Sequence, residues 1–141
     1  MHDPMALLVA DLYQAAGLAR RRGERIAKSE GQSQARWQLL SVVSDGPRTV
    51  AQAARRLGTA RQAVQRVAND LAQEGLLRTQ ANPDHRTSPL FALTDEGAQI
   101  LQRMNGAAAT AHRAQLQALG PDGAARLHDG LRRLIAVLEQ P

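Results

Sequence analysis

The sequence predicts a mainly α-helical protein of about six helices with one β-hairpin, arranged as a winged helix-turn-helix between flanking helices. Three observations favour this α+β class. Aromatic residues make up only 2% of the 141 residues, so the core is built from Leu, Val, Ile and Ala, a composition that favours helices. Two short capped helical patterns follow each other directly within residues 49–75. The periodicity then changes to that of two short strands within residues 76–94.

The first third of the chain predicts two helices. From Pro4 to about Ser29, small and apolar side chains recur at spacings of three and four: Leu8, Leu12, Ala15, Ala16 and Ala19. This helix also carries a basic patch, formed by Arg20, Arg21, Arg22 and Arg25. After the break SEGQS, a second helix runs from about Gln34 to Ser44 and ends before Gly46 and Pro47.

The helix-turn-helix is predicted from its caps. Thr49 and Gln52 have the spacing of a capping box, and Gly58 suits the end of that short helix. Thr59 and Gln62 repeat the capping-box spacing at once. We therefore expect a second helix over residues 60–74, ending before Gly75.

The segment that follows predicts a hairpin and two more helices. Two short, partly alternating runs at residues 76–81 and 89–93 flank the loop NPDHRTS and are expected to pair as strands. Thr94 suits the N-cap of a long helix that extends towards Leu119. The stretch LGPDG then breaks the chain, with Pro121 suited to the first position of the last helix.

One face of the helix at residues 60–74 has the side chains that read the major groove of DNA. Apolar residues form its back, and Arg, Gln and Asn occupy its front: Arg61, Gln62, Gln65, Arg66 and Asn69. Arg can pair bidentately with guanine, and Gln or Asn with adenine. The alternative is an ordinary solvated helix face, and the preceding capped helix and turn favour the DNA interpretation. Thr59 is assigned to the same interface.

The hairpin loop is expected to be a second DNA contact. Asp84, His85 and Arg86 lie at its tip. An arginine there can enter the minor groove beside a helix docked in the major groove. Asp84 would repel phosphate, so we expect it to hold the loop or the guanidinium of Arg86. His85 is expected to make a minor backbone contact, and the alternative for the whole tip is a charged loop that only keeps the hairpin soluble.

These residues resemble the winged helix of the MarR family of bacterial transcription regulators. The family's recognition-helix pattern Leu-Gly-x-x-Arg-Gln-x-Val is matched at residues 57–64, and RWQLL at residues 36–40 resembles its second helix. Its wing signature, Asp-x-Arg followed by Leu-Thr, is matched by Asp84, Arg86, Leu93 and Thr94. The resemblance covers roughly residues 33–98, and the flanking helices match in length and placement.

The resemblance implies a symmetric homodimer that binds a palindromic operator. Residues 33–98 would bind DNA, and residues 1–32 and 99–141 would dimerise. The apolar residues of the terminal helices agree with this, since they offer more apolar surface than one thin protomer can bury: Leu8, Leu12, Leu127, Leu131, Leu134 and Leu138. The alternative is that these helices pack within one chain.

Many family members also bind small aromatic acids, and such binding weakens their affinity for DNA. The resemblance puts this pocket among the first, second and fifth helices, near Tyr13, Arg36, Trp37, Met104 and His112. Two of these residues have other interpretations: Trp37 as a core residue and His112 as a surface or packing residue. The function expected is a DNA-binding regulator, a repressor released by an aromatic or phenolic ligand. The alternatives are an architectural DNA-binding protein without an effector and a protein-interaction adaptor.

The sequence also predicts what this protein lacks. No cysteine is present, which excludes disulfides, thiol chemistry and Cys-ligated zinc. No HxxxH pair, glycine-rich phosphate loop or GxSxG motif occurs, so neither a metal, a cofactor nor an enzyme is expected. The opening segment has no basic region and its apolar run is broken by Asp11, so we expect no membrane partner and a cytoplasmic protein. The net charge of +5 suits a polyanionic partner such as double-stranded DNA.

Overall fold

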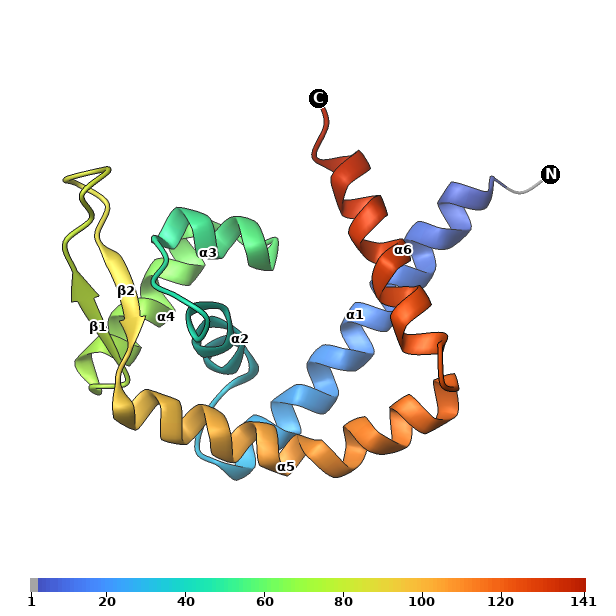
Figure 1. The fold of residues 1–141 in the computed structure, drawn as a ribbon, viewed down its shortest axis with the longest axis horizontal. Helices are drawn as coiled ribbons and strands as arrows, with labels where there is room; N and C mark the ends of the chain where they lie inside the picture. The colour runs from blue at the N-terminus through green and yellow to red at the C-terminus, as the bar shows by residue number, and fades with distance from the viewer. Residues whose placement is uncertain (1–2) are drawn as a thin grey trace. The chain divides into compact units, whose positions relative to one another are not determined.

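The chain folds into six helices and one two-stranded hairpin within residues 3–141, which are those that this computed structural model describes (Figure 1). This confirms the predicted class. The elements in chain order are α1 (Pro4–Ser29), α2 (Gln34–Val43), α3 (Val50–Leu57), α4 (Arg61–Gln73), β1 (Leu77–Gln80), β2 (Leu90–Leu93), α5 (Asp95–Leu119) and α6 (Gly123–Leu138).

The chain divides into two compact units, and the division falls inside α5. The first unit extends to Asn105 and holds α1 to α4, the hairpin and the first part of α5. The second unit, Gly106–Pro141, holds the rest of α5 and α6. The domain boundaries expected from the sequence remain a prediction.

The core of the first unit is aliphatic, as the composition predicts. Leu40, Leu71, Leu77 and Met104 are its largest fully buried side chains. Trp37 is also buried, and its indole Nε1 donates a hydrogen bond to Asn105 Oδ1 at 3.0 Å. Burial of the apolar sides of α2 and α4 in this core leaves the polar side of α4 for solvent or a partner.

The first helix of the helix-turn-helix is capped at both ends as predicted. Thr49 Oγ1 accepts from the Gln52 N–H at 3.1 Å, and Gln52 Oε1 accepts from the Thr49 N–H at 2.9 Å. At the other end Gly58 adopts φ 65°, a left-handed conformation that glycine takes without strain. Its N–H bonds to Arg55 O and the next N–H bonds to Ala54 O, which completes a Schellman motif.

The predicted capping box at the start of α4 is wrong. The helix begins at Arg61, one residue later than expected, and its N-cap Ala60 makes no side-chain cap. Thr59 therefore stands one residue before the N-cap position, and its backbone N–H donates to Ala54 O at 3.1 Å at the end of α3. The end of α4 is as predicted, with Gly75 at φ 76°.

The two threonines therefore predict different effects on stability. Thr49→Ala removes a satisfied N-cap and is expected to lower the free energy of unfolding by about 1 kcal/mol. Thr59→Ala removes no cap and is expected to change it by less than about 0.5 kcal/mol. Urea unfolding of the two variants, monitored by circular dichroism, measures this difference; equal losses would contradict the cap assignment.

The hairpin is antiparallel, with Leu77 opposite Leu93 and Gln80 opposite Leu90. A backbone bridge from Arg48 to Phe91 ties its second strand to the segment before α3. Thr94 caps α5 as predicted, accepting from the Gly97 N–H at 3.0 Å. Its hydroxyl also donates to Gly75 O at 2.7 Å. This bond joins the residue that follows β2 to the residue that follows α4.

In the second unit, α6 begins at Gly123, and the prediction that Pro121 starts it is wrong. The Gly123 N–H bonds to Gly120 O at 3.2 Å, which closes a turn with Pro121 at its second position. The fixed φ of proline suits that position, so the residue shapes the turn instead of the helix. Among the described residues, no helix is both long and apolar enough to cross a bilayer.

Candidate nucleic-acid interface

Helix α4 has the two faces that the sequence predicts. Val64, Ala68 and Leu71 are buried in the core. The whole polar set is exposed: Arg61, Gln62, Gln65, Arg66 and Asn69. Thr59 is exposed in the turn just before the helix.

Two of these side chains hold each other in place. Gln65 Nε2 donates to Asn69 Oδ1 at 2.8 Å, one helical turn away. The pair then still offers the carbonyl oxygen of Gln65 and the amide hydrogens of Asn69. An acceptor beside a donor is complementary to the N6 donor and N7 acceptor of adenine. The sequence spacing places both residues on one face but does not show this bond.

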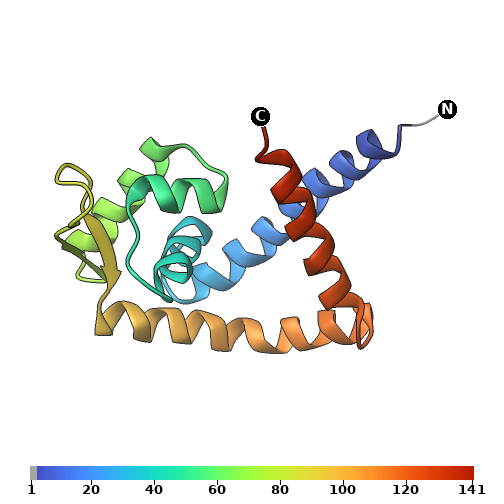
Figure 2. The same cartoon turned by 45° about the horizontal axis from the view of Figure 1, so that its top comes forward.

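The wing is the loop of residues 81–89 between the two strands. It extends beyond the strands on the side of the hairpin away from α5 (Figures 1 and 2). Asp84, His85 and Arg86 are all exposed in it. The His85 ring Nδ1 lies 3.0 Å from the Thr87 hydroxyl, which orients the imidazole.

Asn82 shapes this loop, a role that suits its place at the start of the turn. Its Oδ1 accepts from the Asp84 N–H at 3.1 Å, and its Nδ2 donates to Ser88 O at 2.9 Å. The side chain thereby spans both sides of the loop. Within residues 3–141, no hydrogen bond or ion pair joins Asp84 to Arg86. The guanidinium of Arg86 is therefore available to a partner.

The recognition face and the wing meet at Arg61. Two hollows of about 750 and 310 Å³ lie between the α3–α4 region and the base of the wing, and Arg61 lines both. Gln62 and Gln65 line the smaller hollow, whereas Asp84 and His85 line the larger one. The structure thus brings the two predicted DNA-contacting segments together on one side of the first unit.

Comparison with known proteins identifies the family. Residues 31–86 match the MarR family. An uncharacterised protein of Mycobacterium tuberculosis is 52% identical over 99% of this chain and 97% of its own length. The chain belongs to the MarR family. Members of this family are DNA-binding transcriptional regulators and not enzymes.

Solved structures agree with this fold. The transcriptional regulator BldR of Sulfolobus solfataricus superposes with a TM-score of 0.84 at 19% identity, covering 96% of this chain and 99% of BldR. NadR, solved in complex with 4-hydroxyphenylacetate, superposes with a TM-score of 0.83 at 17% identity, covering 95% of this chain and 94% of NadR.

The five residues expected at the ligand pocket of a MarR-family protein have different surroundings. Trp37 and Met104 are buried in the core, and Tyr13 is 78% exposed. Arg36 points to the end of α4, and His112 belongs to the second unit. The predicted pocket at these residues remains a prediction.

Arg36 instead joins α2 to the end of the recognition helix of this MarR-family fold. Its Nη2 lies 2.8 Å from Glu74 Oε1, at the C-cap of α4. The hydrogen bond from Arg36 lowers the pKa of the Glu74 carboxyl, with a smaller charge effect in the same direction. Arg36 therefore positions one end of α4.

The lowered pKa predicts how this ion pair responds to pH. Because the folded-state pKa of Glu74 lies below its unfolded value, the stability it contributes is present at neutral pH and is lost as pH falls through the lowered pKa. Glu74→Gln is expected to be slightly less stable than the parent protein at pH 7 and equal to it once the carboxyl is protonated. Thermal unfolding across this pH range measures the difference, and a gap that widens towards acid would contradict the pairing.

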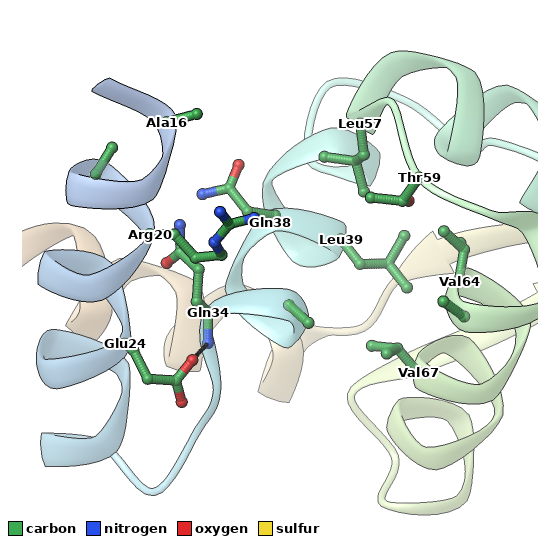
Figure 3. A pocket seen from close by; sticks show the side chains of 13 residues that line it. Ala16, Arg20, Glu24, Gln34, Gln38, Leu39, Leu57, Thr59, Val64 and Val67 are labelled. Atoms are coloured by element: carbon green, nitrogen blue, oxygen red, sulfur yellow. Dashed lines mark hydrogen bonds between the residues drawn. The ribbon is translucent and has the colours of Figure 1, made fainter. Parts of the chain in front are cut away.

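A cavity of about 560 Å³ lies elsewhere in the first unit, between α1, α2 and α4. In Figure 3, Arg20, Gln34 and Gln38 gather between α1 and α2, and Leu39, Leu57, Val64 and Val67 lie across from them. None of the five predicted pocket residues lines it. Sequence patterns could not identify this cavity, since its walls come from four separate helices: α1, α2, α4 and, through Leu57, the end of α3.

The terminal helices expose the apolar residues assigned to dimerisation. In α1, Leu8 is 43% exposed. In α6, Leu127 and Leu138 are 55% and 66% exposed, and Leu131 and Leu134 are partly exposed. No residue of α6 is buried, so the apolar side of that helix is exposed.

Proposed function

We propose that this MarR-family protein is a homodimeric repressor that binds a palindromic operator and releases it when a small aromatic or phenolic acid binds. The observation that carries the DNA-binding part is the meeting of α4 and the wing at Arg61. The recognition face would enter the major groove, and Arg86 would reach the adjacent minor groove. Such a protein acts in the cytoplasm, where its operator is.

The dimer follows from the apolar residues that the terminal helices expose. Helices that leave so many leucines in water are stabilised by burying them against a second copy. A two-fold dimer would set its two recognition helices about 34 Å apart, one turn of DNA. The operator is therefore a palindrome with half-sites one turn apart.

The release by ligand is supported by NadR, which binds 4-hydroxyphenylacetate in a closely similar fold. It is also supported by a cavity of a size typical of small-molecule sites. The alternative is an architectural DNA-binding protein without an effector. An adaptor for other proteins fits less well, since the exposed face of α4 is rich in Arg and Gln.

Three measurements test this proposal. Size-exclusion chromatography with light scattering should give the mass of a dimer. Anisotropy with DNA from upstream of the protein's own gene should give a Kd of about 10⁻⁸ M or lower that rises steeply with salt. Millimolar 4-hydroxyphenylacetate or a related phenolic acid should raise that Kd, and transcription from the same promoter should fall when the protein is added. A monomeric mass would contradict the proposed dimer. A Kd for DNA that a panel of such acids leaves unchanged would contradict the proposed release by ligand.

A further inference from the structure

We propose that Gln65 and Asn69 of α4 act as a pair that reads one adenine in the major groove, so that methylation of that adenine on N6 blocks binding. This inference rests on the DNA-binding part of the proposed function and specifies which base the middle of the recognition helix recognises. It is carried by the hydrogen bond between the two side chains and by the polar groups that this bond leaves free.

The hydrogen bond joins two side chains on the polar face of α4. Gln65 Nε2 donates to Asn69 Oδ1 at 2.8 Å, and both residues are exposed. Residues four apart in a helix lie one turn apart on the same face, so the bond forms without distorting the helix. It restricts the rotation of both side chains, and less conformational entropy is therefore lost when they contact a base.

The bond leaves both an acceptor and a donor free for DNA. Each side-chain amide has a carbonyl oxygen and an NH₂ group, and the bond uses one N–H of Gln65 and one lone pair of Asn69. The Gln65 carbonyl oxygen and the Asn69 NH₂ group are therefore available. Turning both amides over reverses the direction of the bond and again leaves one acceptor beside one donor. The pair thus offers the same chemistry in either arrangement.

Adenine is the base whose own major-groove edge matches this pair. It presents the N6 donor beside the N7 acceptor, whereas guanine presents two acceptors, cytosine a donor, and thymine an acceptor and a methyl group. A G·C pair also places a donor beside an acceptor, but only across its two bases. One N6 hydrogen of adenine pairs with thymine, and the other points into the major groove. An N6-methyl group takes the place of that second hydrogen and so removes the donor that Gln65 and Asn69 need.

The position of the pair on α4 separates its base from the one read by Arg61. Arg61, Gln65 and Asn69 follow each other at intervals of four residues, and four residues advance a helix by about 6 Å. Because successive bases of one strand are about 3.4 Å apart, Arg61 and the pair contact different base pairs. Behind the pair, Val64 and Ala68 are 5% and 0% exposed, so the core holds α4 with its polar face outward.

The first test uses the full-length protein to select bound sequences from a randomised duplex library of about three DNA turns. Gln65→Met and Asn69→Ala should both relax the preference at the same A·T pair and weaken binding of the parent's selected duplex by about tenfold or more. The double variant should lose no more than about twice the larger single loss, because either substitution already breaks the pair. Gln99→Met is the matched control, an exposed glutamine of α5, and should change the Kd by less than about twofold.

The second test changes the adenine itself in the parent's selected duplex and measures anisotropy. N6-methyladenine at the identified position should raise the Kd by about tenfold or more, and 7-deazaadenine, which lacks the N7 acceptor, by about fivefold or more. N6-methylation of an adenine outside the selected positions should change the Kd by less than about twofold. The double variant of Gln65 and Asn69 should also respond to methylation by less than about twofold, since it no longer reads the base.

The outcomes separate this inference from the proposed function. The inference is overturned, while DNA binding by α4 stands, if Gln65→Met and Asn69→Ala relax two different base pairs, if the shared position is a G·C pair, or if N6-methylation leaves the Kd unchanged. If the parent protein enriches no sequence, both the adenine reading and the operator fail. If the adenine is read as predicted while transcription from the protein's own promoter is unaffected, the inference stands and the repressor function fails.

Discussion

Replacing Arg61 by alanine is expected to weaken operator binding by about 30-fold or more and to relax the preference for bases at one position of each half-site. Arg61 is the first residue of α4, is exposed, and lines both hollows between the recognition helix and the wing. An arginine paired with guanine contributes about 1–3 kcal/mol of discrimination, and a dimer loses two. Anisotropy with a set of single-base operator variants measures both effects.

Two further variants show whether this loss is specific. Arg86→Ala should weaken binding more evenly across sequences, since a wing arginine reads the backbone and groove width more than base edges. Arg103→Ala, which removes only a partly exposed pair with Glu30 at 3.6 Å, should change the affinity by less than about twofold. An Arg61→Ala protein with the parent's affinity and base preference would contradict the docking of α4 in the major groove.

Gly97→Ala is expected to destabilise the fold by about 2–3 kcal/mol, whereas Gly106→Ala, in the same helix, should stabilise it by about 0.5–1 kcal/mol. A Cβ on Gly97 would overlap the backbone carbonyl of Leu76, where α5 packs against the start of the hairpin. A backbone atom cannot move aside as a flexible side chain does, so the helix and the hairpin must separate. At Gly106 a Cβ meets nothing within 4 Å, so alanine gains the helix propensity that glycine lacks.

Melting temperatures at one fixed protein concentration measure both substitutions. A loss of about 8–12 °C is expected for Gly97→Ala and a gain of about 2–4 °C for Gly106→Ala. The fixed concentration matters because the apparent stability of a dimer depends on it. Shifts of the same sign would contradict the close approach of α5 to Leu76.

Local rules predicted most of the fold. The caps at Thr49 and Thr94, the glycine stops after α3 and α4, and the two faces of α4 depend on neighbouring residues, which the sequence displays directly. Thr59 does not cap α4 because the helix begins at Arg61, which puts Ala60 at the N-cap position. Spacing alone does not fix where a helix begins to within one residue.

The site was only partly predictable for a related reason. The residues of the recognition face and the wing were named from one helix and one loop, but their meeting at Arg61 depends on how α3 and the hairpin pack. Asn82 was expected to shape the turn, but its two hydrogen-bond partners were not predicted, because these bonds form only once the loop closes. The cavity joins Arg20, Gln34 and Val64 from three helices, and no linear pattern connects them.

The most direct test of the central claim is the affinity of the full-length protein for DNA from upstream of its own gene, compared with a scrambled duplex of the same length and composition at physiological salt. We expect the promoter DNA to bind at least about 10³-fold more tightly than the scrambled duplex, and Arg61→Ala to reduce this ratio of affinities. Equal affinity for the two duplexes, or no binding to either at low salt, would contradict the claim that α4 and the wing form a sequence-reading DNA interface.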